Sequence, residues 1–102
     1  MKQKNGLQAD SFDSPAQSYP RKRANVRVRV VDEETIVLDR RQGLIHQLNQ
    51  TASFVWERCD GRCTLEEIAT RLMEAFDVDF NTAVDDVRKV IEQLEERKLL
   101  EP

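Results

Sequence analysis

Hydrophobic and polar residues alternate from residue 26 onward, and this period of two predicts β-strands. Within 26–30 three valines alternate with two arginines, which predicts a half-buried strand with valines on one face and arginines on the other. A second β-branched run follows at 35–38, and a short apolar run at 44–48. Polar turn residues occupy 32–34 and 40–43. Because both connections are short, we expect an antiparallel meander whose first and third strands are the free edges.

After residue 48 the hydrophobic period becomes that of a helix. Asn49 suits the N-cap of a first helix that ends near Gly61. Thr64 and Glu67 have the spacing of a capping box, which starts a second helix. A third helix is expected from about residues 79–81 to Lys98. One buried stripe is predicted in each helix: Ala52, Val55, Trp56 and Cys59; Leu65, Ile68, Ala69, Leu72, Met73 and Phe76; Ala83, Val84, Val87, Val90, Ile91 and Leu94.

These elements predict an α+β fold, in which a three-stranded antiparallel β-meander is followed by three α-helices that cover one face of the sheet. The short polar link between the second and third helices is typical of a winged helix-turn-helix. Residues 1–20 are polar and show no period, so we expect a disordered N-terminal tail before a domain spanning 21–102.

Composition and the absence of certain motifs argue against several classes of function. The net charge of −3 and the pI near 5.2 argue against a protein held to nucleic acid by phosphate neutralisation. No transmembrane run or signal peptide is apparent, so we expect a cytoplasmic protein with no membrane partner. Cys59, Cys63 and His46 fall short of a four-ligand zinc site, which predicts no metal. Without a phosphate loop, a nucleophile–base set or a cofactor fingerprint, we expect no enzyme activity and no cofactor.

From the third predicted strand to the C-terminus, the order of residues resembles the PqqD-like family. The resemblance covers roughly residues 20–100 and depends on the ordered series, since no single motif in it is specific. The segments that carry it are Ile45-His46-Gln47-Leu48-Asn49-Gln50-Thr51-Ala52, Val55-Trp56, Cys59-Asp60-Gly61-Arg62-Cys63-Thr64-Leu65-Glu66-Glu67-Ile68, Leu72, Phe76-Asp77-Val78-Asp79, and the 86–94 helix with Leu99-Leu100.

The resemblance implies a peptide-recognition element that binds the leader of a ribosomally synthesised precursor peptide. In that family the leader adds a strand beside the third strand, lies against the third helix, and is presented to a modifying enzyme such as a radical SAM protein. An open strand edge suits this role, because it offers unpaired backbone groups. The residues implied for peptide binding are Leu44, Ile45, His46, Gln47 and Leu48 on the strand, with Val84, Val87, Arg88 and Ile91 on the helix. Arg88 would pair with an acidic leader residue.

Two other functions remain open at this point. A winged-helix DNA-binding regulator has the same architecture, and the basic cluster at 21–23 favours it. Against it, the acidic residues of 81–98 outnumber the basic ones, whereas a DNA reader usually shows a basic surface. A scaffold subunit that docks on an enzyme without touching a leader is the third reading. His46 is either a plain strand residue or a contact to the leader, and the two cysteines are either structural or a redox pair.

Overall fold

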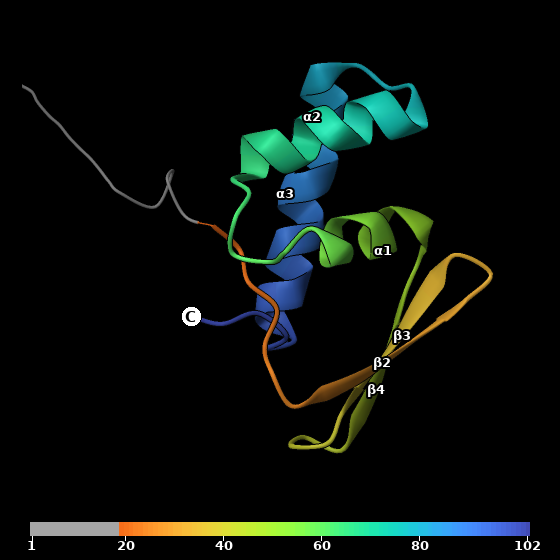
Figure 1. Cartoon of the computed structure of the whole chain (residues 1–102), viewed down its shortest axis with the longest axis vertical. Helices are drawn as coiled ribbons and strands as arrows, with labels where there is room; N and C mark the ends of the chain where they lie inside the picture. Colours follow the sequence, from red (N-terminus) through yellow and green to blue (C-terminus); the bar gives the residue numbers. More distant parts are fainter. Residues whose placement is uncertain (1–18) are drawn as a thin grey trace, which may run out of the picture.

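A computed structural model describes residues 19–102, so the predicted disorder of the N-terminal tail lies almost wholly outside the described residues. Figure 1 shows the sheet at one end of the molecule and the helices stacked beyond it. This arrangement confirms the predicted α+β fold of three antiparallel strands followed by three helices. The elements are β2 (Val26–Val31), β3 (Glu34–Asp39), β4 (Leu44–Leu48), α1 (Gln50–Glu57), α2 (Leu65–Phe76) and α3 (Phe80–Glu96). Within residues 19–102 no helix has the length and apolar character needed to cross a membrane.

Two tight turns set the register of the sheet, whose strand order is β2-β3-β4. Asp32 and Glu33 both have positive φ, 51° and 67°, as the favoured two-residue hairpin turn requires. The second turn, 40–43, includes Gly43 at φ 67°. Asp39 closes that turn, because its carboxylate accepts the backbone N–H of Arg41 at 3.0 Å. Both neighbouring pairs are antiparallel, which confirms the meander.

The sheet is covered less completely than the strand pattern predicts. Alternate residues of β3 are fully buried against the helices, among them Val37. The valine face of β2 was expected to be half-buried, yet Val28 is 48% and Val30 is 56% exposed, so that expectation was wrong. The expectation that all three helices cover the sheet was also wrong, because only the short α1 packs directly on it. This helix contacts β3 and β4 and does not reach β2.

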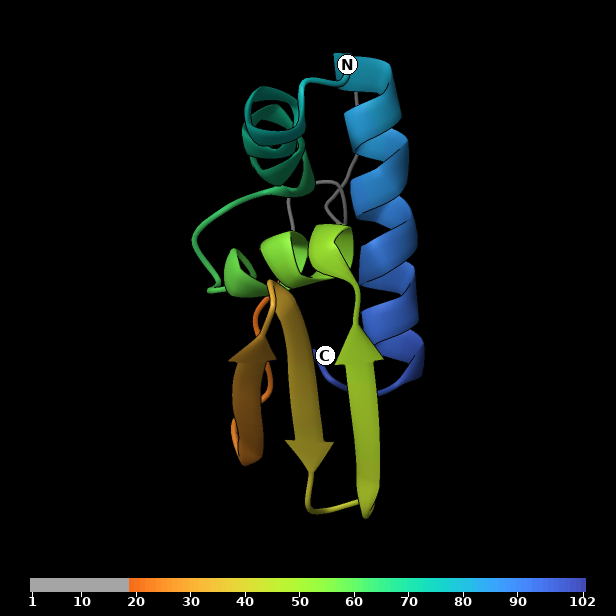
Figure 2. The same cartoon turned by 90° about the vertical axis from the view of Figure 1, so that its right-hand side faces the viewer.

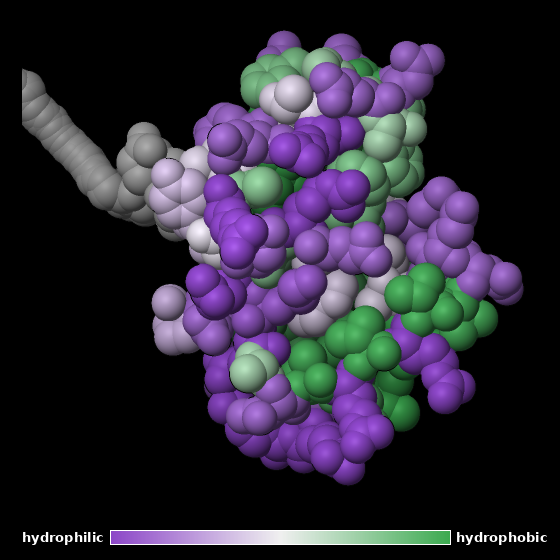
Figure 3. All heavy atoms as spheres, viewed as in Figure 1, coloured by the Kyte–Doolittle hydropathy of each residue, from purple (hydrophilic) through white to green (hydrophobic). Residues whose placement is uncertain are grey.

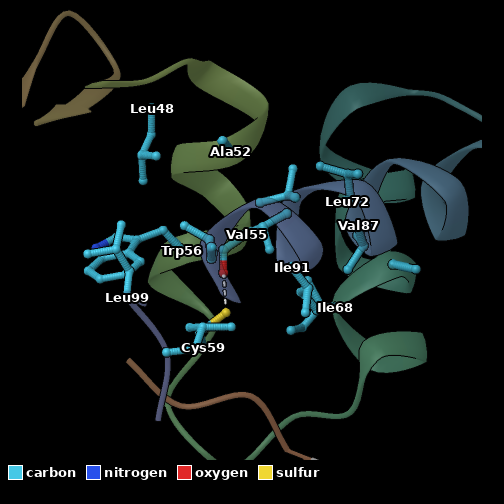
Figure 4. Close-up of a cluster of buried hydrophobic side chains, with 14 of the residues drawn as sticks. Leu48, Ala52, Val55, Trp56, Cys59, Ile68, Leu72, Val87, Ile91 and Leu99 are labelled. Carbon is cyan, nitrogen blue, oxygen red and sulfur yellow. Dashed lines mark hydrogen bonds between the residues drawn. The ribbon is translucent and has the colours of Figure 1, made fainter. Parts of the chain in front are cut away.

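The core lies where α1, α2, α3 and the C-terminal segment meet (Figure 4). Trp56 is its largest side chain and is 2% exposed. Leu48 at the end of β4 points toward Trp56 and Leu99, which ties the sheet to the helices. The first helix ends at Glu57, earlier than the expected end near Gly61. Cys59 nevertheless remains buried, and its thiol donates to the carbonyl of Val55, 3.3 Å away.

The basic cluster at 21–23 is fixed to the body of the domain by its backbone. The N–H of Lys22 donates to the carbonyl of Cys59 at 2.7 Å, and that of Arg23 donates to the carbonyl of Leu99 at 2.9 Å. The Lys22 ammonium also lies 5.7 Å from the centre of the Trp56 ring. The cluster therefore joins the first described residues to the α1–α2 connection and to the C-terminal segment.

The second and third helices begin as the sequence predicts. Thr64 Oγ1 accepts the N–H of Glu67 at 3.2 Å while the Glu67 carboxylate accepts the N–H of Thr64 at 2.8 Å, which confirms the capping box. Asp77 ends α2 with a φ of 56°, and Asp79 caps α3 two residues later. This short link gives α2 and α3 the expected helix-turn-helix arrangement.

Candidate functional site at the free edge of β4

β4 is paired on one side only. In Figure 2 the three strands lie side by side, β4 forms one border of the sheet, and α3 runs along that side of the molecule. Among the described residues no backbone of α3 pairs with β4, and α1 connects the two elements. The border of β4 is therefore an open strand edge on the side of the molecule along which α3 runs.

The first hairpin fixes which backbone groups of the sheet point toward β4. In a two-residue hairpin the closing pair, here Val31 and Glu34, has its backbone groups turned toward each other. The next residue, Thr35, must then turn its backbone toward β4. Its N–H donates to Ser53 Oγ at 2.8 Å, and the Ser53 hydroxyl donates to the Leu48 carbonyl at 3.1 Å. This bridge shows that the backbones of Thr35 and Leu48 face each other.

The orientation alternates along an antiparallel pair, so it can be followed down β4. Leu44, His46 and Leu48 turn their N–H and C=O groups toward their β3 partners. Ile45 and Gln47 therefore turn theirs away from the sheet, toward the open edge. Each contributes one donor and one acceptor, in the alternating arrangement that an added strand requires.

The side chains of β4 divide between the two faces of the sheet. Leu44, His46 and Leu48 lie on the face that carries the helices, and Ile45 and Gln47 lie on the opposite face. Leu44 is 47% and Ile45 is 72% exposed, whereas Leu48 belongs to the core. The half-buried His46 has no hydrogen-bond partner for its buried Nε2 among residues 19–102. Gln47 donates from Nε2 to the Glu34 carboxylate at 2.8 Å.

A hollow of about 250 Å³ lies between the start of α1 and α3, next to the end of β4. Its residues on α3 follow the spacing i, i+3, i+4 and i+7, so they form one face of that helix. Asp86 and Lys89 have opposite charges, and neither makes an ion pair within the described part of the chain. The lining residues are Asn49, Thr51, Ala52, Asp86, Lys89, Val90 and Gln93.

The α3 residues implied by the family resemblance lie on other faces of the helix. Val87 and Ile91 are buried in the core, and Val84 is half-buried against it. Arg88 is exposed and pairs with Asp85 at 3.2 Å. None of the four lines the hollow. Their role in peptide binding stays a prediction, and the structure brings a different set of α3 residues toward β4.

The hollow-lining face of α3 was missed at the sequence level, although a signal for it was present. The buried stripe of α3 runs through Ala83, Val87 and Leu94. At 100° per residue, positions 86, 89 and 93 fall on the flank of that stripe. Assigning that flank to the side of β4 requires knowing on which side of the sheet α3 packs.

The buried thiol carries no reactive chemistry at neutral pH. Burial raises the pKa of Cys59 to about 12, while Cys63 is half-buried; both are free thiols. A redox or nucleophilic cysteine needs a lowered pKa and an accessible sulfur, and Cys59 has neither. The β4 edge itself offers backbone donors and acceptors at Ile45 and Gln47, together with side-chain contacts.

Comparison with solved structures shows the same fold in peptide-recognition proteins. TbiB1 in complex with the TbiA(beta) leader peptide matches with a TM-score of 0.72 and 25% identity, over 79% of this chain and 94% of that one. A lasso peptide synthetase B1 complexed with its leader peptide matches with a TM-score of 0.72 and 26% identity, over 82% and 99%. No curated protein sequence matches this chain.

A third solved structure links the fold to one family. It is the PqqD truncation of Methylobacterium extorquens PqqCD, a stand-alone recognition element for ribosomally synthesised and post-translationally modified peptides. It matches with a TM-score of 0.67 and 25% identity, over 87% of this chain and 94% of that one. The family model for coenzyme PQQ synthesis protein D matches residues 34–100, about two thirds of the sequence. The chain therefore belongs to the PqqD family.

Proposed function

We propose that this protein is a non-catalytic chaperone that binds the leader of a ribosomally synthesised precursor peptide and presents it to a modifying enzyme. The observation that carries the proposal is the open edge of β4, where Ile45 and Gln47 turn their backbone groups outward beside the hollow on α3. The family and the leader complexes of two structural neighbours support it.

Strand addition at β4 would use two kinds of contact. Backbone pairing with Ile45 and Gln47 gives affinity that does not depend on the leader's side chains. Alternate leader side chains would point toward the helices, where Leu44, His46 and the hollow lie. The free Nε2 of His46 and the unpaired charges of Asp86 and Lys89 offer polar contacts there, and these select the sequence of the leader.

The modifying enzyme is a separate partner in this proposal, and a radical SAM protein is one class that fits. The chain itself contributes no reactive group at β4. Its only histidine lies half-buried on the strand, and its most buried cysteine has a raised pKa. In this proposal the chain binds the leader, and the modifying enzyme catalyses the reaction.

A winged-helix DNA-binding role is not favoured. A recognition helix needs a basic surface, and the exposed part of α3 carries more acidic than basic residues. Part of the basic cluster that favoured DNA also makes contacts within the domain, since Lys22 Nζ donates to the carbonyl of Glu57 at 3.4 Å and Arg21 Nε lies 3.9 Å from the Glu101 carboxylate.

A binding titration tests the proposal. Fluorescein-labelled leader peptides from open reading frames beside the gene are titrated with the full chain, and anisotropy is recorded; a labelled random DNA duplex and a scrambled leader are the controls. We expect saturable binding of one leader and weaker binding of its scrambled form. Binding of the duplex alone, lost as salt is raised, would replace the chaperone role with the regulator role.

A further inference from the structure

The face of the sheet opposite the helices carries a second, separate surface. The register places residues of the three strands in rows across this face. One row is Arg27, Leu38 and Ile45, and the next is Arg29, Ile36 and Gln47. We call Arg27, Arg29, Ile36, Leu38 and Ile45 the outer sheet surface. Figure 2 shows the three strands that carry it.

The outer sheet surface is apolar and open. It borders a shallow hollow of about 420 Å³, to which Val28 also contributes. Ile45 is 72% exposed, the highest value for a large hydrophobic residue among those described. Figure 3, in which the sheet is seen from its edge, shows apolar residues gathered over the strands, in contrast to the largely polar surface over the helices. An apolar surface of this kind in a small domain marks an interaction site.

Two arginines edge this apolar surface, and neither is neutralised within the domain. Arg27 and Arg29 form no salt bridge with any carboxylate of residues 19–102. Glu34, an acidic residue that the register places on the same face, already accepts a hydrogen bond from Gln47. The charges are therefore available to a partner that brings carboxylates.

The same arginines argue against a second copy of this chain as the occupant. If β2 paired with β2 of another copy around Val28, Arg27 of one strand would lie opposite Arg29 of the other. Like charges directly opposite in a sheet are destabilising, and charged residues on an edge strand prevent such pairing.

We propose that the outer sheet surface docks the peptide-modifying enzyme, through an apolar element of that enzyme flanked by Asp or Glu side chains. This inference rests on the proposed function, because it supplies the partner to which the leader is presented. Burial of the apolar centre against the enzyme would stabilise the complex. The two arginines would orient the partner and disfavour surfaces that lack acidic residues.

The geometry also connects the two sites. A leader strand added to β4 would place every second side chain on the same face as Ile45 and Gln47, which extends both rows by one residue. The enzyme would then contact leader and chaperone together. Docking is therefore tighter with leader bound than without it.

The test compares two double variants of the full chain that carry the same change in charge. R27E/R29E reverses the outer sheet surface, and R62E/R71E reverses two exposed arginines in the α1–α2 connection and α2. Affinity for the modifying enzyme encoded beside the gene is measured by biolayer interferometry, with and without leader, and leader affinity by anisotropy. Thermal melts establish that both variants fold.

We expect R27E/R29E to weaken enzyme binding by about tenfold or more, and to leave leader affinity within about twofold, since β3 and β4 lie between β2 and the leader. R62E/R71E should change neither. Equal enzyme affinity in the two variants would overturn the docking proposal. A wild-type chain that binds a DNA duplex but not the enzyme would overturn it as well. A wild-type chain that binds the enzyme but no leader would instead overturn the proposed function and would not contradict the docking proposal.

Discussion

Replacing Gln47 with proline tests strand addition at the level of a single backbone group. Proline has no N–H, so Gln47→Pro removes one of the two amides that β4 turns toward the open edge. The amide is not part of the ladder with β3, because residues 44, 46 and 48 make that pairing. The fold should therefore tolerate the change, since edge positions facing solvent accept proline.

The expected loss of leader affinity follows from the hydrogen bond and its partner. A net backbone hydrogen bond is worth about 1 kcal/mol, and leaving the leader's carbonyl buried without a donor costs about 1–3 kcal/mol. A loss of about 1–3 kcal/mol corresponds to about 5-fold to 150-fold weaker binding.

Two controls separate the backbone effect from other effects of the substitution. Gln47→Ala removes the side-chain contact to Glu34 but keeps the amide, so leader affinity should stay within about twofold. Val28→Pro removes an outward amide at the opposite edge, on β2, and should also leave leader affinity unchanged. Affinities are measured by anisotropy on variants with cooperative urea transitions. Equal affinity of folded Gln47→Pro and wild type would refute strand addition at β4.

Three further predictions concern the fold. Trp56→Ala should lower the free energy of unfolding by about 3–5 kcal/mol, because the indole is 2% exposed at the centre of the core; a urea titration showing less than about 1 kcal/mol would contradict this. With a pKa of about 12, Cys59 should resist a thiol reagent at neutral pH until the chain is denatured, while Cys63 reacts in the native protein; native labelling of Cys59, read by mass spectrometry, would contradict its burial. The Gln42 side-chain amide lowers the pKa of Asp39 below its ordinary value of 3.8, so the contribution of Asp39 to stability is present above 3.8 and is lost as the pH falls below it. Urea midpoints from about pH 5 to about pH 2 should fall less steeply in Asp39→Asn than in wild type, and parallel curves would contradict this reading.

The order and type of the elements could be predicted from local patterns. The strand β2, the two turns and the capping box at Thr64 each depend on residues close in sequence, and the structure contains all of them. The family, too, was recognisable from the ordered series of residues between Ile45 and Leu100. None of these features depends on how elements distant in sequence pack against each other.

The features that the sequence did not predict all depend on packing between distant elements. The exposure of Val28 and Val30 follows from the short reach of α1, which the strand pattern alone does not contain. The face of α3 that carries Asp86 and Lys89 toward β4 depends on the side of the sheet on which α3 lies. The outward turn of the Ile45 backbone required the register of both hairpins.

Amide hydrogen exchange, followed residue by residue by NMR with and without a saturating leader peptide, tests the central claim most directly. The amides of Ile45 and Gln47 lie outside the ladder and should exchange fast in the free protein, then gain protection when the leader pairs with them. The Val28 amide, outward on the opposite edge, should exchange equally fast in both states. Protection of Val28, or a saturated complex in which Ile45 and Gln47 still exchange fast, would contradict leader binding by strand addition at β4.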